Sequence, residues 1–239
     1  VRIDTCHGVL GFLTYFSCHP VVGPQTSRYI HSDFAGLATN WLEREFPGTV
    51  GLFLQGCQGD INTCVVHHSE QDSLLALDVI AARYARQIRP GLEDAVDIAC
   101  EQVRAIRETI RLSRDPMPRE QVEEMLTERE AILQAPGASD ASPEVRMATV
   151  YAIALRRELA RLDAGESHDD RIEIQGFRIG DLRIVGAPLE MMNRYRLRVE
   201  AEFDRPTLVL GLCNDTLGYA PVRECFSQEG NYAARMVPV

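Results

Sequence analysis

Short apolar segments separated by small polar clusters make up the N-terminal part of the chain. Residues 8–16 (GVLGFLTYF) and 49–56 (TVGLFLQG) are rich in strand-forming residues and too short to span a bilayer. We expect each to be a buried strand that ends at a polar loop. Residues 32–43 lie between them, begin with a Ser-Asp capping signal and continue with apolar positions at helical spacing. The pattern predicts a strand, a helix and a second strand, joined by loops.

Helical and strand periodicity alternate further along the chain. Residues 74–88 have apolar positions at i, i+3, i+4 and i+7, which is typical of an amphipathic helix, and we expect Gly91 to follow its end. Residues 171–185 alternate between apolar and polar positions around Gly180-Asp181, which predicts a hairpin.

Three other segments complete the expected architecture. Residues 96–112 mix β-branched and charged side chains, so a strand is favoured and a helix stays open. We expect residues 191–202 to form an arginine-rich helix and residues 207–212 to form a strand. The expected fold class is therefore α/β, with mixed β-sheets flanked by helices.

A helical hairpin is expected as an insertion at about residues 115–165. Residues 119–134 and 143–162 are strongly helical, and the turn-rich segment PGASDAS connects them. The charges along these helices are expected to form a solvated face, with an interaction surface or a lid as the alternative. They include Glu120, Glu123, Glu124, Arg156, Arg157 and Glu158. We treat residues 1–239 as a single domain that contains this insertion.

Composition limits the classes of function. With 239 residues, of which 45% are hydrophobic, the chain can bury a substantial core, and its formal charge of −10 argues against a nucleic-acid partner. All 25 cationic residues are arginine, which excludes a Schiff-base lysine and a P-loop lysine. No transmembrane segment is expected. Seven cysteines, an odd number, favour a cytoplasmic location, while a secreted one stays open. Homo-oligomer formation also stays open.

Three candidate metal ligands follow predicted strands. His19 comes directly before Pro20, Glu190 follows the second strand of the expected hairpin, and Tyr219 follows the last strand. A catalytic zinc takes about three protein ligands of nitrogen or oxygen type and keeps a position for water. The alternatives are a structural histidine, a glutamate in an ordinary salt bridge and a packed tyrosine.

Six short motifs in order along the chain resemble the neutral ceramidase family of zinc-dependent amidases and its bacterial relatives. The motifs are FSCHPVV around His19, Ser32-Asp33-x-x-Gly36, QGCQGDIN at residues 55–62, Pro188-Leu189-Glu190, LGLCNDTLGYAPVREC around Tyr219, and Gly230-Asn231-Tyr232. The resemblance implies that zinc is bound by His19, Glu190 and Tyr219. It further implies catalytic roles for Asp60, Asn62 and Tyr232, and substrate-binding roles for Gly59 and Asp33. From the residues alone, Asp60 and Asn62 in a glycine-rich loop can also be turn formers.

The chain departs from the family pattern at three points. Asn62 stands where ceramidases have a serine, Leu189 replaces a glycine, and the family's first zinc histidine lies upstream of the strand that precedes His19. We therefore expect the chain to represent the later part of such a catalytic domain.

The expected function is zinc-dependent hydrolysis of an amide bond in an N-acylated small-molecule or lipid substrate, with ceramide-like sphingolipids in view. Zinc would polarise the carbonyl, and Tyr232 together with the loop amides near Gly59 to Asn62 would hold the oxyanion. One alternative is a non-catalytic, ceramidase-like binding protein, motivated by Asn62. Another is a thiol mechanism in which Cys57 is the nucleophile and His19 its base.

Overall fold

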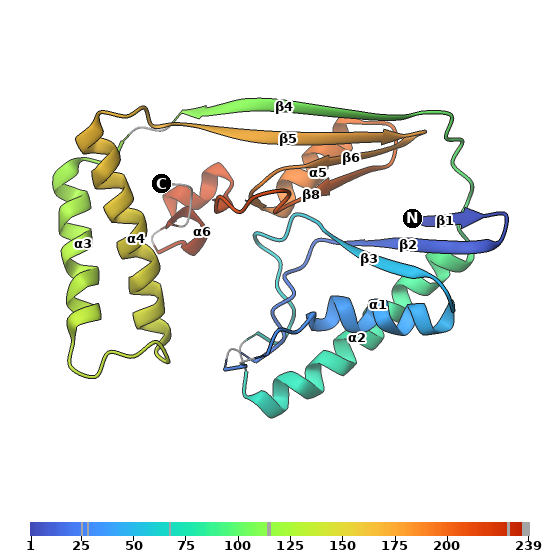
Figure 1. Ribbon diagram of the computed structural model, residues 1–239, viewed down its shortest axis with the longest axis horizontal. Coiled ribbons are helices and arrows are strands. Elements are labelled where there is room, and N and C mark those ends of the chain that lie inside the picture. The colour runs from blue at the N-terminus through green and yellow to red at the C-terminus, as the bar shows by residue number, and fades with distance from the viewer. Residues whose placement is uncertain (25, 28, 67, 114–115, 229, 236–239) are drawn as a thin grey trace. The chain divides into compact units, whose positions relative to one another are not determined.

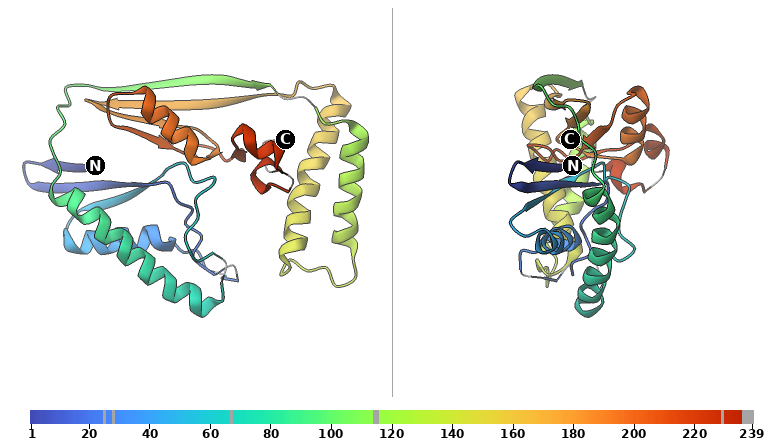
Figure 2. Two further views of the ribbon diagram at one scale, coloured as in Figure 1. Left: turned by 180° about the vertical axis from the view of Figure 1, so that it is seen from behind. Right: turned by 90° about the vertical axis from the view of Figure 1, so that its right-hand side faces the viewer.

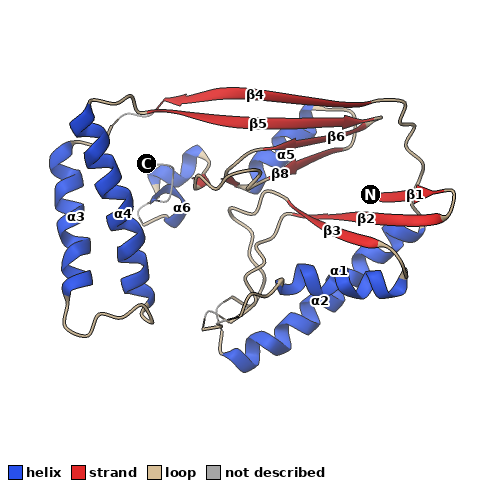
Figure 3. Cartoon of the chain, viewed as in Figure 1, coloured by secondary structure: helices blue, strands red, loops and turns tan. Residues whose placement is uncertain are grey.

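The computed structural model describes the chain except for residues 25, 28, 67, 114–115, 229 and 236–239 (Figure 1). It divides into two compact units, one formed by Val1–Glu108 together with the segment from Glu173 onward, the other by Thr109–Ile172. Its mixed sheets flanked by helices confirm the expected α/β class (Figure 3). No helix in the described part of the chain is long and apolar enough to cross a membrane.

The N-terminal sheet of the first unit has the order β1-β2-β3. Its strands are β1 (Arg2–Thr5), β2 (Gly8–Phe16) and β3 (Val50–Gln55), and its helices are α1 (Asp33–Glu45) and α2 (Glu70–Glu93). Strand β2 pairs antiparallel with β1 and parallel with β3. Both helices lie on one face of this sheet (Figures 1 and 2). The predicted strand, helix and strand are therefore confirmed, with β1 in addition.

A single apolar core joins this sheet to its two helices. Phe12, Phe34, Leu42 and Leu77 are almost completely buried. The ring of Tyr84 contacts Phe34 edge-on, with ring centroids 5.7 Å apart. Edge-on aromatic pairs of this kind stabilise a core beyond the area they bury. The end of β2, from which His19 follows, is thus fixed by a rigid core.

Helix α2 is longer than its apolar periodicity indicates. It begins after Ser69, whose hydroxyl accepts a hydrogen bond from the Asp72 N–H, and it runs through Pro90 and Gly91 to Glu93. The expected end before Gly91 is therefore wrong. Gly91 does not have the positive φ of a helix-ending glycine, so the backbone remains helical beyond it.

The second sheet has the order β4-β5-β6-β8, and part of it extends into the second unit. Its strands are β4 (Val103–Ser113), β5 (Asp169–Ile179), β6 (Leu182–Gly186) and β8 (Thr207–Leu210). β5 and β6 form the predicted hairpin, and β8 is parallel to β6. Residues 103–113 are a strand rather than a helix, and nearly all of their side chains are exposed.

Several short elements follow β6 in the remainder of the chain. They are β7 (Glu190–Met191), α5 (Asn193–Glu202), β9 (Tyr219–Ala220), the 3-10 helix η1 (Arg223–Ser227) and α6 (Tyr232–Arg235). Strand β7 is parallel to β9 and pairs Glu190 with Tyr219. Met191 was expected to be helical, but it belongs to β7, and α5 begins at Asn193.

The second unit contains the expected helical hairpin, α3 (Arg119–Gln134) and α4 (Pro143–Ala164). Ser142 caps α4, and Gly165 ends it in the left-handed conformation with φ of 61°. Most of the charged positions named above are exposed, as expected. Glu158 is a correction, because it is only 2% exposed and lies 2.8 Å from the His168 ring. Its position on the face of α4 that packs inward, with Leu155, explains its burial.

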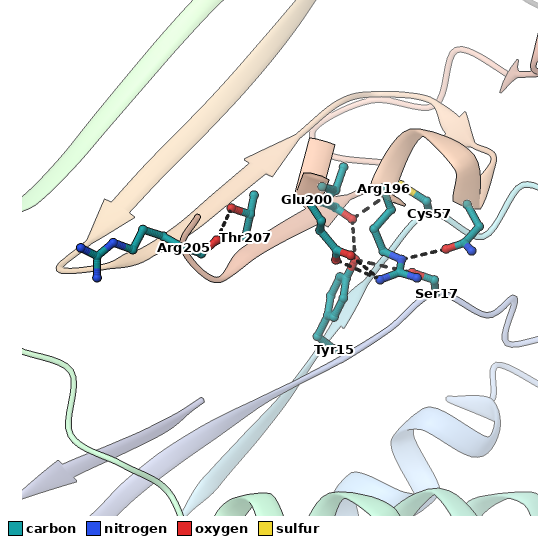
Figure 4. Close-up of polar contacts among 9 residues, drawn as sticks. Tyr15, Ser17, Cys57, Arg196, Glu200, Arg205 and Thr207 are labelled. Atoms are coloured by element: carbon teal, nitrogen blue, oxygen red, sulfur yellow. Dashed lines mark hydrogen bonds and ion pairs between the residues drawn. The ribbon is translucent and has the colours of Figure 1, made fainter. Parts of the chain in front are cut away.

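Contacts at the strand ends join the two sheets within the first unit. The Tyr15 hydroxyl of β2 donates to the Val209 carbonyl of β8 at 3.1 Å, and the Cys57 thiol, after β3, points at the same oxygen at 3.8 Å (Figure 4). The Gly211 N–H donates to the Gln55 carbonyl, and Gly56 forms an isolated bridge with Leu210. We call these contacts the strand-end joint. They bring the loops after β2, β3 and β8 to one edge.

The substitution Tyr15→Phe tests the joint. Loss of the hydroxyl removes a hydrogen bond to Val209, and we expect the free energy of unfolding to fall by about 1 kcal/mol, the net value of a typical buried hydrogen bond. Denaturant unfolding followed by circular dichroism measures this change. Tyr29→Phe is the matched control, because the Tyr29 side chain is exposed. Equal effects of the two substitutions would contradict the role of the joint.

Candidate active site

His19 and Glu190 lie side by side at the edge formed by the strand ends. The His19 Nε2 atom is 3.3 Å from the Glu190 Oε2 atom, and both side chains are less than one-fifth exposed. His19 follows β2, where Pro20 prevents the strand from continuing. Glu190 follows β6 by a short turn and begins β7. The structure therefore brings together two residues that are distant in sequence.

Tyr219 is the third candidate ligand at this place. Its strand pairs it with Glu190, and its phenol lies close enough to the Glu190 carboxylate to be affected by its charge. Burial and the neighbouring Glu190 carboxylate both raise the pKa of Tyr219. The phenol is therefore protonated near neutral pH. Tyr232 packs edge-on against the Tyr219 ring, with ring centroids 5.7 Å apart, and is about half exposed.

Burial lowers the pKa of His19 below its ordinary value, and the Glu190 carboxylate opposes this shift. The imidazole is therefore mainly neutral near pH 7. A neutral imidazole is the form that binds metal ions. The environment of His19 thus keeps it in the state that a metal ligand needs.

The glycine-rich loop after β3 contacts the segments of both residues. The Gly59 N–H donates to the Met191 carbonyl at 2.8 Å, Asp60 Oδ1 accepts from the Asn193 N–H at 2.7 Å, and the Ile61 carbonyl accepts from the His19 N–H at 2.9 Å. The Gly59 N–H is thus engaged within the chain and is not directed at a substrate oxygen. This geometry corrects the expectation that the Gly59 amide would hold an oxyanion.

A second loop holds the turn that precedes Glu190. The N–H groups of Leu212, Cys213 and Leu217 donate to the carbonyls of residues 189, 187 and 188, at 3.1, 2.9 and 3.0 Å. Leu212 and Asn214 have positive φ values of 53° and 67°. A branched side chain in this region costs about 1–2 kcal/mol, so the contacts to the Glu190 segment offset local strain. Leu189 fits this turn without a positive φ, although the resemblance expects glycine there.

Two further predicted site residues take other positions. Asn62 is exposed at the end of the glycine-rich loop. Asp33 is buried at the start of α1, where its two carboxylate oxygens accept hydrogen bonds from the N–H groups of Gly23 and Phe34, both at 2.8 Å. These bonds give Asp33 a structural role in the loop between β2 and α1. Its role as a substrate-binding residue, like that of Asn62 in catalysis, stays a prediction.

The environment of Cys57 does not fit a thiol nucleophile. Its side chain is fully buried, and burial raises its pKa to about 11. Its thiol points at the Val209 carbonyl in the strand-end joint, beside Tyr15 (Figure 4). Reactive cysteines have a depressed pKa and are accessible. Cys57 is therefore a structural residue.

The donor set of this site fits a zinc ion. One imidazole nitrogen and one carboxylate oxygen are donors that zinc accepts, and a catalytic zinc commonly has about three protein ligands. Among the described residues, no group of three or more His, Cys, Asp or Glu side chains is placed to hold a metal ion. Such a site in this chain would therefore depend on the tyrosine as well as on His19 and Glu190.

Comparisons with known proteins agree with this arrangement at the level of the fold. No protein-family model and no curated protein sequence matches the chain. Solved structures do match it. The fold is similar to that of part of a neutral ceramidase.

Two structures carry the comparison. Neutral ceramidase from Pseudomonas aeruginosa matches with a TM-score of 0.65 and 17% identity over 99% of this chain and 42% of its own. A structure described as ceramidase complexed with C2 matches with a TM-score of 0.62 and 18% identity over 99% of this chain and 44% of its own. The chain spans less than half the length of these ceramidases.

The sequence patterns missed the contacts that hold the site together. The bond between Asp60 and Asn193 joins residues 133 positions apart, and no local pattern indicates it. In the sequence, Gly59 is one of several glycines in a loop, and nothing distinguishes it from the others. The structure shows why position 59 requires glycine, because a Cβ there would lie 2.7 Å from the Glu190 carbonyl oxygen.

Gly59→Ala tests this close approach. The new methyl group would displace the backbone of Glu190 and Met191, and overpacking of this kind typically costs about 1–3 kcal/mol of unfolding free energy. The measurement is denaturant unfolding. Gly91→Ala is the control, since no atom lies near its Cβ position and alanine favours the helix that contains it. If Gly59→Ala left the free energy of unfolding unchanged, the loop would not be in close contact with the Glu190 segment.

Alkylation of the native protein tests the assignment of Cys57. At pH 8 we expect iodoacetamide to modify the exposed Cys6, Cys64 and Cys100, and to leave Cys57 unmodified because its pKa of about 11 keeps the thiol protonated and its burial excludes the reagent. Peptide mass spectrometry identifies the modified residues. Cys57 should react only after denaturation. Rapid modification in the native state would restore the thiol mechanism.

Proposed function

We propose that this chain contributes the metal-binding part of a zinc-dependent, ceramidase-like amide hydrolase. The observation that carries the proposal is the 3.3 Å approach of the His19 ring to the Glu190 carboxylate, with Tyr219 paired opposite Glu190 on the neighbouring strand. The similarity in fold to neutral ceramidases supports the reaction class. The proposed substrate is an N-acylated small molecule or lipid of ceramide-like chemistry.

The residues of the site have distinct tasks in this proposal. His19, Glu190 and Tyr219 hold the zinc ion. When bound, zinc polarises a carbonyl and lowers the pKa of a water ligand toward about 7. Tyr232 lies against Tyr219 and is exposed enough to reach a substrate, so its hydroxyl is assigned to the substrate carbonyl oxygen. Exposed Asn62 orients the substrate or water through its amide.

A non-catalytic binding protein is the second candidate. Asn62 favours it, because a carboxamide cannot act as a nucleophile in place of the serine that ceramidases carry at the matching position. In this case the site would still bind a metal or an N-acylated ligand but would not cleave the amide. Binding and turnover therefore have to be measured separately.

Zinc binding and amide hydrolysis test the proposal in the protein and its variants. We expect about one zinc ion per chain by elemental analysis, and fatty-acid release from a short-chain N-acylsphingosine. His19→Ala and Glu190→Gln should each weaken zinc affinity by more than about 100-fold, beyond the effect typical of outer-shell substitutions. Competition with a chromophoric chelator measures the affinity.

The control is His7→Ala, which removes an exposed histidine in the turn between β1 and β2. It should leave zinc affinity and hydrolysis unchanged. Stoichiometric zinc without hydrolysis would favour the binding protein. Equal zinc affinity in the protein, His19→Ala and Glu190→Gln would contradict the proposed ligands.

A further inference from the structure

Three successive residues hold both segments that carry the proposed ligands. Gly59 binds the Met191 carbonyl, Asp60 binds the Asn193 N–H, and Ile61 binds the His19 N–H. We call residues 59–61 the clamp. Two of its contacts use main-chain atoms only. Asp60 alone contributes a side chain, so it is the member of the clamp whose contact depends on residue type.

The contact made by Asp60 satisfies the start of helix α5. The first N–H groups of a helix have no partner within it and favour a negative charge or an acceptor nearby. Within α5, all of whose residues the structure describes, Met192 provides no side-chain cap and the first turn has no acidic residue. Asp60 supplies the missing acceptor from a loop 133 positions away, at 2.7 Å from the Asn193 nitrogen.

Other contacts at the beginning of this helix involve partly exposed side chains. None of the residues of α5 is buried, although Tyr195 packs beside Met192 and its hydroxyl donates to the Pro221 carbonyl at 3.0 Å. Asn193 follows Glu190 by only three positions, through β7 and Met192. A bond to the Asn193 N–H therefore restrains the main chain that carries the Glu190 carboxylate.

We propose that Asp60 is a positioning residue, which holds Glu190 beside His19 by capping helix α5, and is not the acid or base of the reaction. The expected effect on zinc binding rests on the proposed function. The capping of α5 by Asp60 does not depend on that function. The Oδ1 atom of the Asp60 carboxylate is directed at the helix N-terminus. An amide oxygen in the same place would do the same task.

Asp60→Ala and Asp60→Asn separate positioning from proton transfer. We expect Asp60→Ala to speed amide hydrogen exchange of residues 196–198, the first that intrahelical bonds protect, by roughly fivefold, as for the loss of one helix cap. It should weaken zinc affinity by about tenfold, the range of outer-shell partners. Asp60→Asn keeps the acceptor and should stay within about twofold of the protein in both measurements. It should also keep any amide hydrolysis that the protein shows.

Substitutions of Asn193 test the same bond from the donor side. Asn193→Pro removes the N–H at the first helical position, where proline is compatible with the helix, and Met192 already has the extended backbone that precedes proline. In this background Asp60→Ala should have no further effect on exchange. In the Asn193→Ala background, which keeps the N–H, the effect of Asp60→Ala should be undiminished. Should Asp60→Ala fail to fold, Asp60→Asn and Asn193→Pro decide the question.

Asp72→Ala is the control for loss of a carboxylate at a helix N-terminus, since Asp72 contacts the Ser69 cap of α2. It should alter neither exchange of residues 196–198 nor zinc affinity. Unchanged exchange in Asp60→Ala and Asn193→Pro, or acceleration by Asp60→Asn equal to that by Asp60→Ala, would overturn the inference. Absence of zinc binding by the unsubstituted protein counts against the proposed function, whereas the exchange measurements still decide the role of Asp60.

Discussion

The contacts of Tyr15 and Cys57 with the Val209 carbonyl oxygen position the loops that carry the candidate site residues. Tyr15 and Cys57 both reach the Val209 carbonyl, so the end of β8 lies against the ends of β2 and β3. His19 follows β2 by a few residues, and the clamp follows β3 in the same way. Because β6 is paired with β8, the turn to Glu190 begins at the same edge. The strand-end joint thus helps to give the two sheets a common edge at which these loops converge.

Beyond the joint, the site is positioned mainly by main-chain hydrogen bonds. The turn before Glu190 receives N–H groups from the loop that contains Leu212 and Asn214, and Met191 receives one from Gly59. Main-chain contacts of this kind require a close approach, which explains why a side chain at position 59 would collide with the Glu190 carbonyl. They also explain why Leu212 remains in a left-handed conformation. The strain is local, whereas the bonds it permits fix a whole segment.

The sequence predicted those features that depend on local periodicity. Strand β2, the β5–β6 hairpin and the helical hairpin follow from apolar spacing and turn residues, and the structure confirms them. Periodicity could not decide between strand and helix for residues 103–113. Almost none of their side chains is buried, so the sequence there does not alternate between apolar and polar positions. It also failed for Glu158, which lies on the inward face of α4 and contacts His168 from the segment after that helix.

The candidate site shows the same division between local and long-range information. His19, Glu190 and Tyr219 were accessible from sequence because each follows a strand and lies in a short motif. The contact between Asp60 and Asn193 was not, because it is a pairing of distant segments that depends on the completed fold. The burial of Cys57 could not be predicted either, because its thiol contacts the Val209 carbonyl of β8, which is distant in sequence.

The pKa of His19 distinguishes two interpretations of its contact with Glu190. In a salt bridge that serves only the fold, the carboxylate would dominate and raise the pKa of the histidine. Here burial dominates and lowers it. A mainly neutral imidazole gains little from ion pairing with the carboxylate. The same arrangement suits a cation, because the imidazole needs no deprotonation near neutral pH before it binds one. The pair thus holds the histidine mainly in the neutral state that the proposed metal ligation requires.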